Sequence, residues 1–235
     1  MMFNCRMVNF CLIIIGDSDL RVENELNKVF IKKPLILHIP FIISGDQPEW
    51  LEWTMKDGKT LAGIGQGAAG CLIAHRRAWA LLQSQGFKYA IVLESDAELT
   101  RYGRKYLEKF ILKLGESDEN IIHLGSHEKN LLVAKFENIS RWSLRNILLE
   151  IYEKYLLKFS IPVLAARKFP FSTHAYVINS ETASELLEIP PNFLAPVDVL
   201  LNAFSQVRSN KIATVRTPLL VQKLHSESLT RKFGR

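Results

Sequence analysis

The stretch Tyr89-Ala90-Ile91-Val92-Leu93-Glu94-Ser95-Asp96-Ala97-Glu98 decides how this chain folds. Its apolar half is short and lies between a glycine and an acidic cluster, which favours a buried strand over a helix. Ligands of open α/β sheets bind outside the carboxyl ends of the strands. Carboxylates there suit Mg²⁺ or Mn²⁺, which in turn bind phosphates. The stretch therefore predicts a strand that ends in a metal site or, alternatively, in a solvated acidic turn.

Strand-like and helix-like segments alternate along the rest of the 235 residues. Short apolar runs predict strands at 9–15, 35–43, 89–93, 121–124, 176–178 and 212–215. Apolar residues at spacings of three and four predict helices at 20–30, 70–85 and 104–114, and a further helix capped by Ser180. This alternation predicts an α/β fold in one domain, with a mostly parallel central sheet flanked by helices.

The region 126–168 departs from this alternation. Residues 142–159 place apolar side chains on one helical face and lysine and arginine elsewhere. We interpret the region as a helical insertion that builds the acceptor side of a site or touches a membrane surface. The alternative is an ordinary packed helix with a solvated basic face.

Composition limits the partners and the compartment. The formal net charge of +6 suits nucleic acid, an anionic membrane surface or a polyanionic substrate. No long basic run is interleaved with aromatic residues, so we expect no nucleic-acid partner. Three cysteines without a CxxC pair indicate a reducing cytoplasm. The apolar run 9–15 is too short to span a bilayer, and we interpret it as a first buried strand rather than a signal sequence.

The sequence Gly65-Gln66-Gly67-Ala68-Ala69-Gly70 spells the GxGxxG pattern of a dinucleotide loop. Its context does not fit, because no strand clearly feeds it and no acidic ribose partner follows. We expect these glycines to allow a close approach of the loop and to start the helix that carries His75. A histidine on such a helix is otherwise a core residue held by hydrogen bonds.

Several segments together resemble one family. The matching segments are Gly70-Cys71-Leu72-Ile73-Ala74-His75, then Trp79, the strand end Leu93-Glu94-Ser95-Asp96, then Ser172-Thr173-His174-Ala175-Tyr176, Pro196-Val197-Asp198, and Pro218-Leu219-Leu220-Val221-Gln222. In this order they resemble the family-25 glycosyltransferases of bacterial lipooligosaccharide synthesis. Each segment alone is weakly specific, whereas five in the same order, from about residue 65 to 230, are fairly specific.

The resemblance implies a GT-A-like nucleotide-sugar transferase fold, a nucleotide-sugar donor that is usually UDP-galactose, a divalent metal, and inversion at the anomeric carbon. It also implies donor-binding roles for five residues of the matching segments, namely Gly70, His75, Glu94, Thr173 and Gln222. Two departures stand out. Ser95 replaces the middle acid of the family's Glu-Asp-Asp, and Arg21 stands near the place of the family's diphosphate-binding arginine, after the acidic residues Asp17 and Asp19.

The chemistry of glycosyl transfer assigns roles to the acidic residues. Asp96 is the first choice for a direct metal ligand, with Glu94 as a ligand or as a hydrogen-bond acceptor behind it. His225, near the C-terminus, is a further candidate ligand. The acceptor hydroxyl needs a general base, for which Asp198 is the first candidate and Glu98 the competitor. Asp198 could instead be a helix N-cap.

Together these inferences predict a cytoplasmic glycosyltransferase that uses Mn²⁺ or Mg²⁺. It would move a hexose, galactose from UDP-galactose, onto a lipooligosaccharide or another surface glycan. The basic surface suits peripheral contact with the inner membrane. The alternative is a degenerate family member that binds nucleotide or glycan without turnover, as Ser95 suggests.

Overall fold

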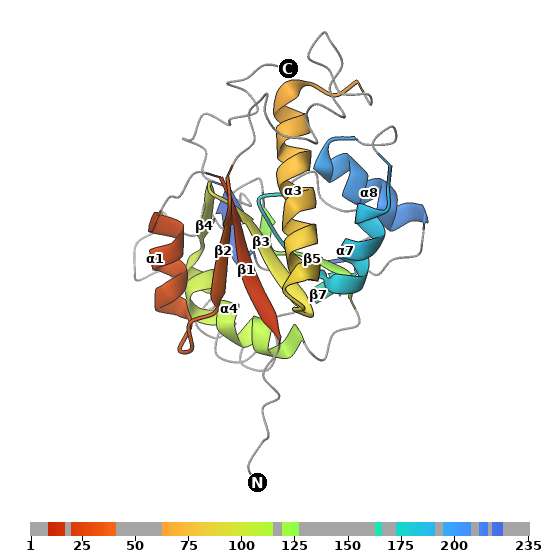
Figure 1. Cartoon of the computed structure of the whole chain (residues 1–235). Coiled ribbons are helices and arrows are strands. Elements are labelled where there is room, and N and C mark those ends of the chain that lie inside the picture. Colours follow the sequence, from red (N-terminus) through yellow and green to blue (C-terminus); the bar gives the residue numbers. More distant parts are fainter. Residues whose placement is uncertain are drawn as a thin grey trace, which may run out of the picture.

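A mixed sheet of seven strands forms the centre of the computed structural model (Figure 1). The structure describes residues 9–16, 20–40, 63–114, 119–126, 163–165, 173–190, 195–207, 212–215 and 218–222. The strands are β1 (Phe10–Ile15), β2 (Leu35–Ile39), β3 (Tyr89–Glu94), β5 (Ile121–His123), β7 (Val163–Ala165), β8 (Ala175–Asn179) and β9 (Ile212–Val215). Their order across the sheet is β2-β1-β3-β8-β5-β9-β7.

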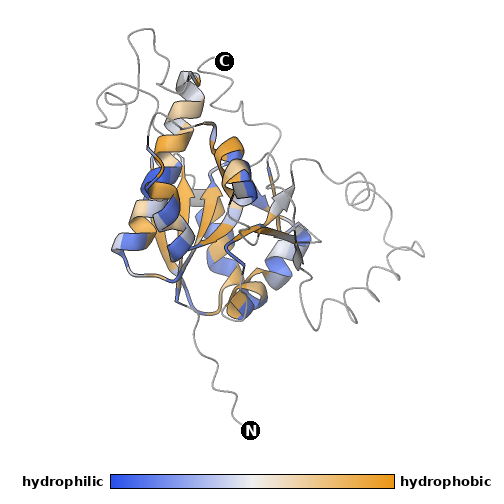
Figure 2. Ribbon diagram, turned by 90° about the vertical axis from the view of Figure 1, so that its right-hand side faces the viewer, coloured by the Kyte–Doolittle hydropathy of each residue, from blue (hydrophilic) through white to orange (hydrophobic). Residues whose placement is uncertain are grey.

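Five of these strands run in one direction. β1 pairs in parallel with β2 and β3, and β5 pairs in parallel with β9. β8 lies antiparallel between β3 and β5, and β7 pairs antiparallel with β9 at the edge. The central strands are apolar along almost their whole length because helices cover both faces, and Figure 2 shows these hydrophobic strands inside the ribbon. The predicted α/β fold with a mostly parallel sheet is confirmed.

The helices divide between two hydrophobic clusters, one on each face of the sheet. Leu26 of α1 (Leu20–Val29) and Leu107 of α4 (Arg101–Lys113) belong to one cluster. The other contains residues of α3 (Gln66–Ser84), α7 (Ser180–Leu187) and α8 (Val197–Val207). Arg76 links α3 to the end of α7. Its guanidinium donates hydrogen bonds to the carbonyl oxygens of Leu186, Leu187 and Ile189. The last carbonyls of a helix lack intrahelical donors, and Arg76 supplies donors to three carbonyls at this end of α7.

A second sheet of three short strands joins the end of the chain to its middle. It consists of β4 (Ala97–Leu99), β10 (Leu220–Gln222) and β6 (Gly125–Ser126). Thr100 links this sheet to α4, because its hydroxyl donates to the Pro218 carbonyl and accepts from the backbone N–H of Gly103. A Cβ at Gly103 would lie 2.0 Å from the Leu219 carbonyl oxygen, so only glycine allows this approach.

Element boundaries differ from the predicted ones at several points. Helix α3 begins at Gln66 instead of residue 70, and α4 begins at Arg101 instead of residue 104. The N-cap of α7 is Asn179, whose side chain accepts from the Thr182 N–H, so the prediction of Ser180 was wrong by one residue. Within the region 126–168, residues 163–165 form β7, and the predicted helix at 142–159 lies outside the described residues. Among the helices that the structure does describe, none has the length and apolar character needed to cross a bilayer.

Candidate functional site

The loop after β3 meets the end of β1 at the carboxyl edge of the main sheet. The Ser95 N–H donates to the carbonyl of Ile15, and the Glu94 N–H donates to the carbonyl of His174. Gly16 has a φ of +127°, and a Cβ on it would lie 2.3 Å from the Ser95 hydroxyl oxygen. Gly16 therefore provides both the backbone conformation and the space that Ser95 needs.

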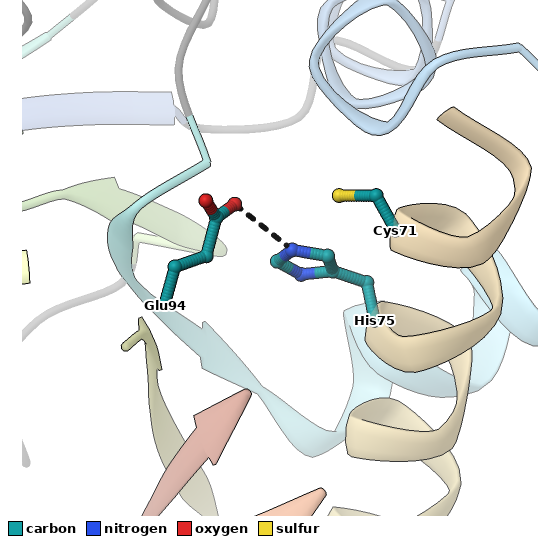
Figure 3. Close-up of side chains that lie close together, drawn as sticks. All are labelled: Cys71, His75 and Glu94. Carbon is teal, nitrogen blue, oxygen red and sulfur yellow. Dashed lines mark hydrogen bonds and ion pairs between the residues drawn. The ribbon is translucent and has the colours of Figure 1, made fainter. Parts of the chain in front are cut away.

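Glu94 projects from the end of β3 into a set of hydrogen-bond donors. Its Oε1 accepts from the Thr173 hydroxyl at 2.5 Å and lies 3.3 Å from Nε2 of His75 (Figure 3). No described residue donates to Oε2. The side chain is 23% exposed. One carboxylate oxygen is thus held by the protein, and the other is available to a ligand.

The protonation of Glu94 is set by opposing influences. Burial raises the pKa of Glu94, whereas the hydrogen bond and charge of His75 and the hydrogen bond from Thr173 lower it, and the net pKa is below its ordinary value. The charged form is favoured because donors stabilise it directly. Glu94 is therefore a carboxylate at neutral pH.

His75 lies in the core of the protein and has no exposed surface. Its Nδ1 is 2.8 Å from the Tyr176 hydroxyl, which also accepts from the indole N–H of Trp79 at 3.0 Å. The sequence left two interpretations of His75 open, a core residue held by hydrogen bonds and a residue of the site. The structure places it in the core and also in contact with Glu94. In this arrangement the ring has no exposed surface, and its Nε2 faces Glu94.

Asp96 is held from the small sheet. Its Oδ2 accepts from the side-chain amide of Gln222 at 2.8 Å. The antiparallel register of β4 and β10 places Gln222 opposite Ala97, beside Asp96. Glu98 lies in β4 on the face opposite to the buried Ala97 and Leu99.

Asp198 reaches the same region from α8. The helix begins at Val197, so Asp198 lies inside its first turn and is not the N-cap, and its Oδ1 accepts from the Val199 N–H. Burial raises the pKa of the Cys71 thiol far above its ordinary value, and the charges of Glu94, Asp198 and Asp96 raise it further. The charges of three carboxylates, from β3, the following turn and α8, therefore act on one thiol.

Cys71, His75 and Glu94 could in principle hold a metal ion, because one ligand atom from each lies within 4.8 Å of the others (Figure 3). Zinc takes these ligand types, but the ligand is a thiolate. Without a cation, burial raises the pKa of the Cys71 thiol, and a hydrogen bond with Thr173 lowers it in part; a bound zinc ion would itself favour the thiolate. In this structure, His75 and Thr173 hydrogen-bond with Glu94 in this cluster. Sequence reasoning did not single out Cys71, although the Gly-Cys pair of the quoted motif pointed to it.

The remaining predicted residues divide into three groups. Thr173 and Gln222 hydrogen-bond with the two carboxylates. Gly70 is buried early in α3. Arg21 lies in α1, but its side chain is not described, and His225 lies outside the described residues.

Comparison with known proteins adds one informative match. The profile of glycosyltransferase family 25 (LPS biosynthesis protein) matches residues 47–201, about two thirds of the chain. No curated protein matches significantly.

Two solved structures are similar at low identity. The protein A197 from STIV has a TM-score of 0.45 and 8% identity over 91% of this chain and 83% of its own. A glycosyltransferase involved in the glycosylation of the major capsid of PBCV-1 has a TM-score of 0.42 and 9% identity over 93% of this chain and 95% of its own. Both are too distant to support an argument about activity.

Proposed function

The chain belongs to glycosyltransferase family 25, and from this premise we propose that it is a metal-dependent, inverting hexosyltransferase. The proposed donor is UDP-galactose and the proposed acceptor is a lipooligosaccharide or another surface glycan. One observation carries the proposal: the negative charges of Glu94, Asp96 and Asp198 all raise the pKa of the Cys71 thiol, which lies close to Glu94 at the end of β3. This end of β3 lies at the carboxyl edge of the sheet, where open α/β sheets bind ligands.

The donor set fits a hard divalent cation. Glu94 offers Oε2, and Asp96 is oriented by Gln222, so both supply the oxygen ligands that Mn²⁺ and Mg²⁺ prefer. We propose these two residues as ligands, with His225 as a third candidate. A bound cation would act as a Lewis acid that offsets the charge of the departing diphosphate.

Asp198 is the proposed general base. The Val199 N–H holds its Oδ1, and no described residue donates to Oδ2. Oδ2 can therefore accept the proton of an acceptor hydroxyl as that oxygen attacks the anomeric carbon. Glu98, two residues beyond Asp96, is the competing candidate.

Further contacts with the donor, and the location of the protein, are also proposed. Arg21 and Gly70 would contact the donor, whereas Thr173, Gln222 and His75 would act on it through the carboxylates that they hold. We also propose a cytoplasmic location, which rests on the three cysteines without a CxxC pair, and peripheral contact with the inner membrane, which rests on the net charge of +6.

The test combines a donor screen with one variant. UDP-, GDP- and CMP-sugars are assayed for hydrolysis and transfer with Mn²⁺ and with a chelator. Asp198→Asn keeps the size of the side chain and should lower turnover by about 10²–10⁴-fold, with little change in UDP affinity. Glu188→Gln, at an exposed position near the end of α7, is the matched control.

Two results would redirect the proposal. Near-normal turnover of Asp198→Asn at saturating acceptor would transfer the base role to Glu98. Metal-stimulated UDP binding without hydrolysis or transfer of any donor would favour the alternative that the protein binds nucleotide without turnover, which the serine at position 95 motivates.

A further inference from the structure

A line of four side chains runs from the core to the site. Trp79, Tyr176 and His75 have no exposed surface, and Glu94 at the end of the line is partly exposed. The heavy-atom distances along the line are 3.0 Å, 2.8 Å and 3.3 Å. The imidazole and phenol rings also stack, with centroids 5.6 Å apart and an interplanar angle of 22°.

The direction of these hydrogen bonds follows from the chemistry of the groups. The indole N–H of Trp79 can only donate, so the Tyr176 oxygen accepts from it. Burial raises the pKa of Tyr176 well above its ordinary value, so the phenol keeps its own proton. That proton can be donated to Nδ1 of His75, 2.8 Å away.

This donation fixes the tautomer of His75. A neutral imidazole carries one N–H, and an Nδ1 that accepts leaves the hydrogen on Nε2. Nε2 is the nitrogen that faces Oε1 of Glu94. The opposite tautomer would direct two donors at the Tyr176 oxygen and place a lone pair of Nε2 against a carboxylate.

We propose that Trp79 and Tyr176 are positioning residues, which hold His75 in the Nε2–H tautomer so that it donates to Glu94. Thr173 donates to the same oxygen, so the pair fixes Oε1 and turns Oε2 toward the site. The tautomer assignment stands on the hydrogen-bond geometry and on the buried phenol keeping its proton, whereas the benefit to cation binding rests on the proposed function.

Nitrogen NMR of the full chain with ¹⁵N-labelled histidine tests the tautomer. The His75→Gln variant identifies the His75 signals among the six histidines. At a pH where His75 is neutral, the wild type should show a protonated Nε2 and an unprotonated Nδ1. A protonated Nδ1 beside an unprotonated Nε2 in the wild type would overturn the proposal; the tautomer is read from the wild type, and His75→Gln serves only to assign its signals.

Two tyrosine variants test the role of Tyr176. Tyr176→Phe removes the donor to Nδ1 and should shift the His75 signals toward a mixture of tautomers. Tyr89→Phe changes a tyrosine that is also buried but packs in the other hydrophobic cluster, and should leave these signals unchanged. An unaltered tautomer in Tyr176→Phe would overturn the proposal.

Calorimetry with UDP and Mn²⁺ tests the positioning effect separately. Residues behind a metal ligand typically change metal affinity by about 10–100-fold, and we expect Tyr176→Phe to weaken Mn²⁺-stimulated UDP binding by about tenfold. Unchanged affinity together with a shifted tautomer would overturn the positioning role. If Mn²⁺ does not stimulate UDP binding by the wild type, the proposed function fails, and the NMR result still decides the hydrogen-bond direction.

Discussion

Glu94 and Asp96 are two residues apart, yet the protein holds them in different ways. Glu94 receives its donors from α3 and from the residues before β8, with a buried line of aromatic side chains behind His75. Asp96 receives an amide from β10, a three-residue strand of the small sheet. One carboxylate is thus anchored in the core of the main sheet, and the other to a peripheral sheet.

These two ways of holding a carboxylate suit two tasks of a metal site: presenting a ligand in a fixed orientation, and adjusting when the donor binds. A carboxylate fixed by several buried groups supplies a ligand whose orientation is set before binding. A carboxylate that accepts from an amide of a short peripheral strand can adjust when that strand moves on ligand binding. We therefore expect changes near Glu94 to alter orientation, and changes near Asp96 to alter the response to the ligand itself.

The largest expected effect comes from removing the two charges in turn. Asp96→Asn should lower turnover by about 10³-fold, because it removes charge from the proposed direct ligand. Glu94→Gln should lower it by about 10–100-fold, because the amide oxygen still accepts from His75 and Thr173. Turnover at saturating Mn²⁺ and donor measures both. Equal losses, or a larger loss in Glu94→Gln, would contradict the comparison.

The next effect concerns the junction that both carboxylates share. Gly16→Ala combines a left-handed backbone with a clash against Ser95, and should lower the free energy of unfolding by about 3 kcal/mol. Gly86 has a φ of +68° with no atom near its absent Cβ, so Gly86→Ala should cost about 1–2 kcal/mol as a matched control. Urea denaturation gives both values, and equal losses would show that the Ser95 contact adds nothing.

A smaller effect separates the two anchors. Gln222→Leu removes the donor to Asp96, and Thr173→Val removes a donor to Glu94. Each should weaken Mn²⁺ affinity by about tenfold. Because the two donors share no described partner, the losses in free energy should add in the double variant. If calorimetry shows that the loss of Mn²⁺ binding free energy in the double variant differs strongly from the sum of the single losses, the two carboxylates bind the ion as one unit.

The smallest effect is a pH dependence of stability. The folded-state pKa of Glu94 lies below its ordinary value, so its contribution to stability is present above about pH 4.3 and is lost as pH falls through the lower folded value. Glu94→Gln should therefore be less stable than the wild type near neutral pH and approach it in acid. Parallel stability curves from pH 3 to 7 would contradict this expectation.

Apolar patterning predicted the main sheet and its helices because buried strands and amphipathic helices carry that pattern locally. Strands β4, β6 and β10 have two or three residues each, which is too short for any period to show. Asn179 rather than Ser180 caps α7, because both residue types can cap and only the backbone decides between them.

The site was predictable in part. Glu94, Asp96 and His75 stand in recognisable motifs, but the line behind them joins His75 to a tyrosine 101 residues later in the chain. No spacing rule connects such residues, because their contact depends on the pairing of β3 with β8. Ser95 looks like a lost acid in the sequence, whereas in the structure its hydroxyl occupies the space that Gly16 leaves open.

The antiparallel pairing of β3 with β8 also bears on the order in which the protein folds. It joins residues 89–93 to residues 175–179, which are 82 to 90 residues apart, a slightly longer separation than the 79 residues between the paired β1 and β3. Closing so long a loop costs entropy before any contact offsets it, so such pairings tend to form late in folding. Tyr176 and Thr173 arrive with β8. A chain that has formed only β1, β2 and β3 would have the acidic loop but not Tyr176 and Thr173 beside it. Glu94 would therefore be oriented only after β8 pairs with β3.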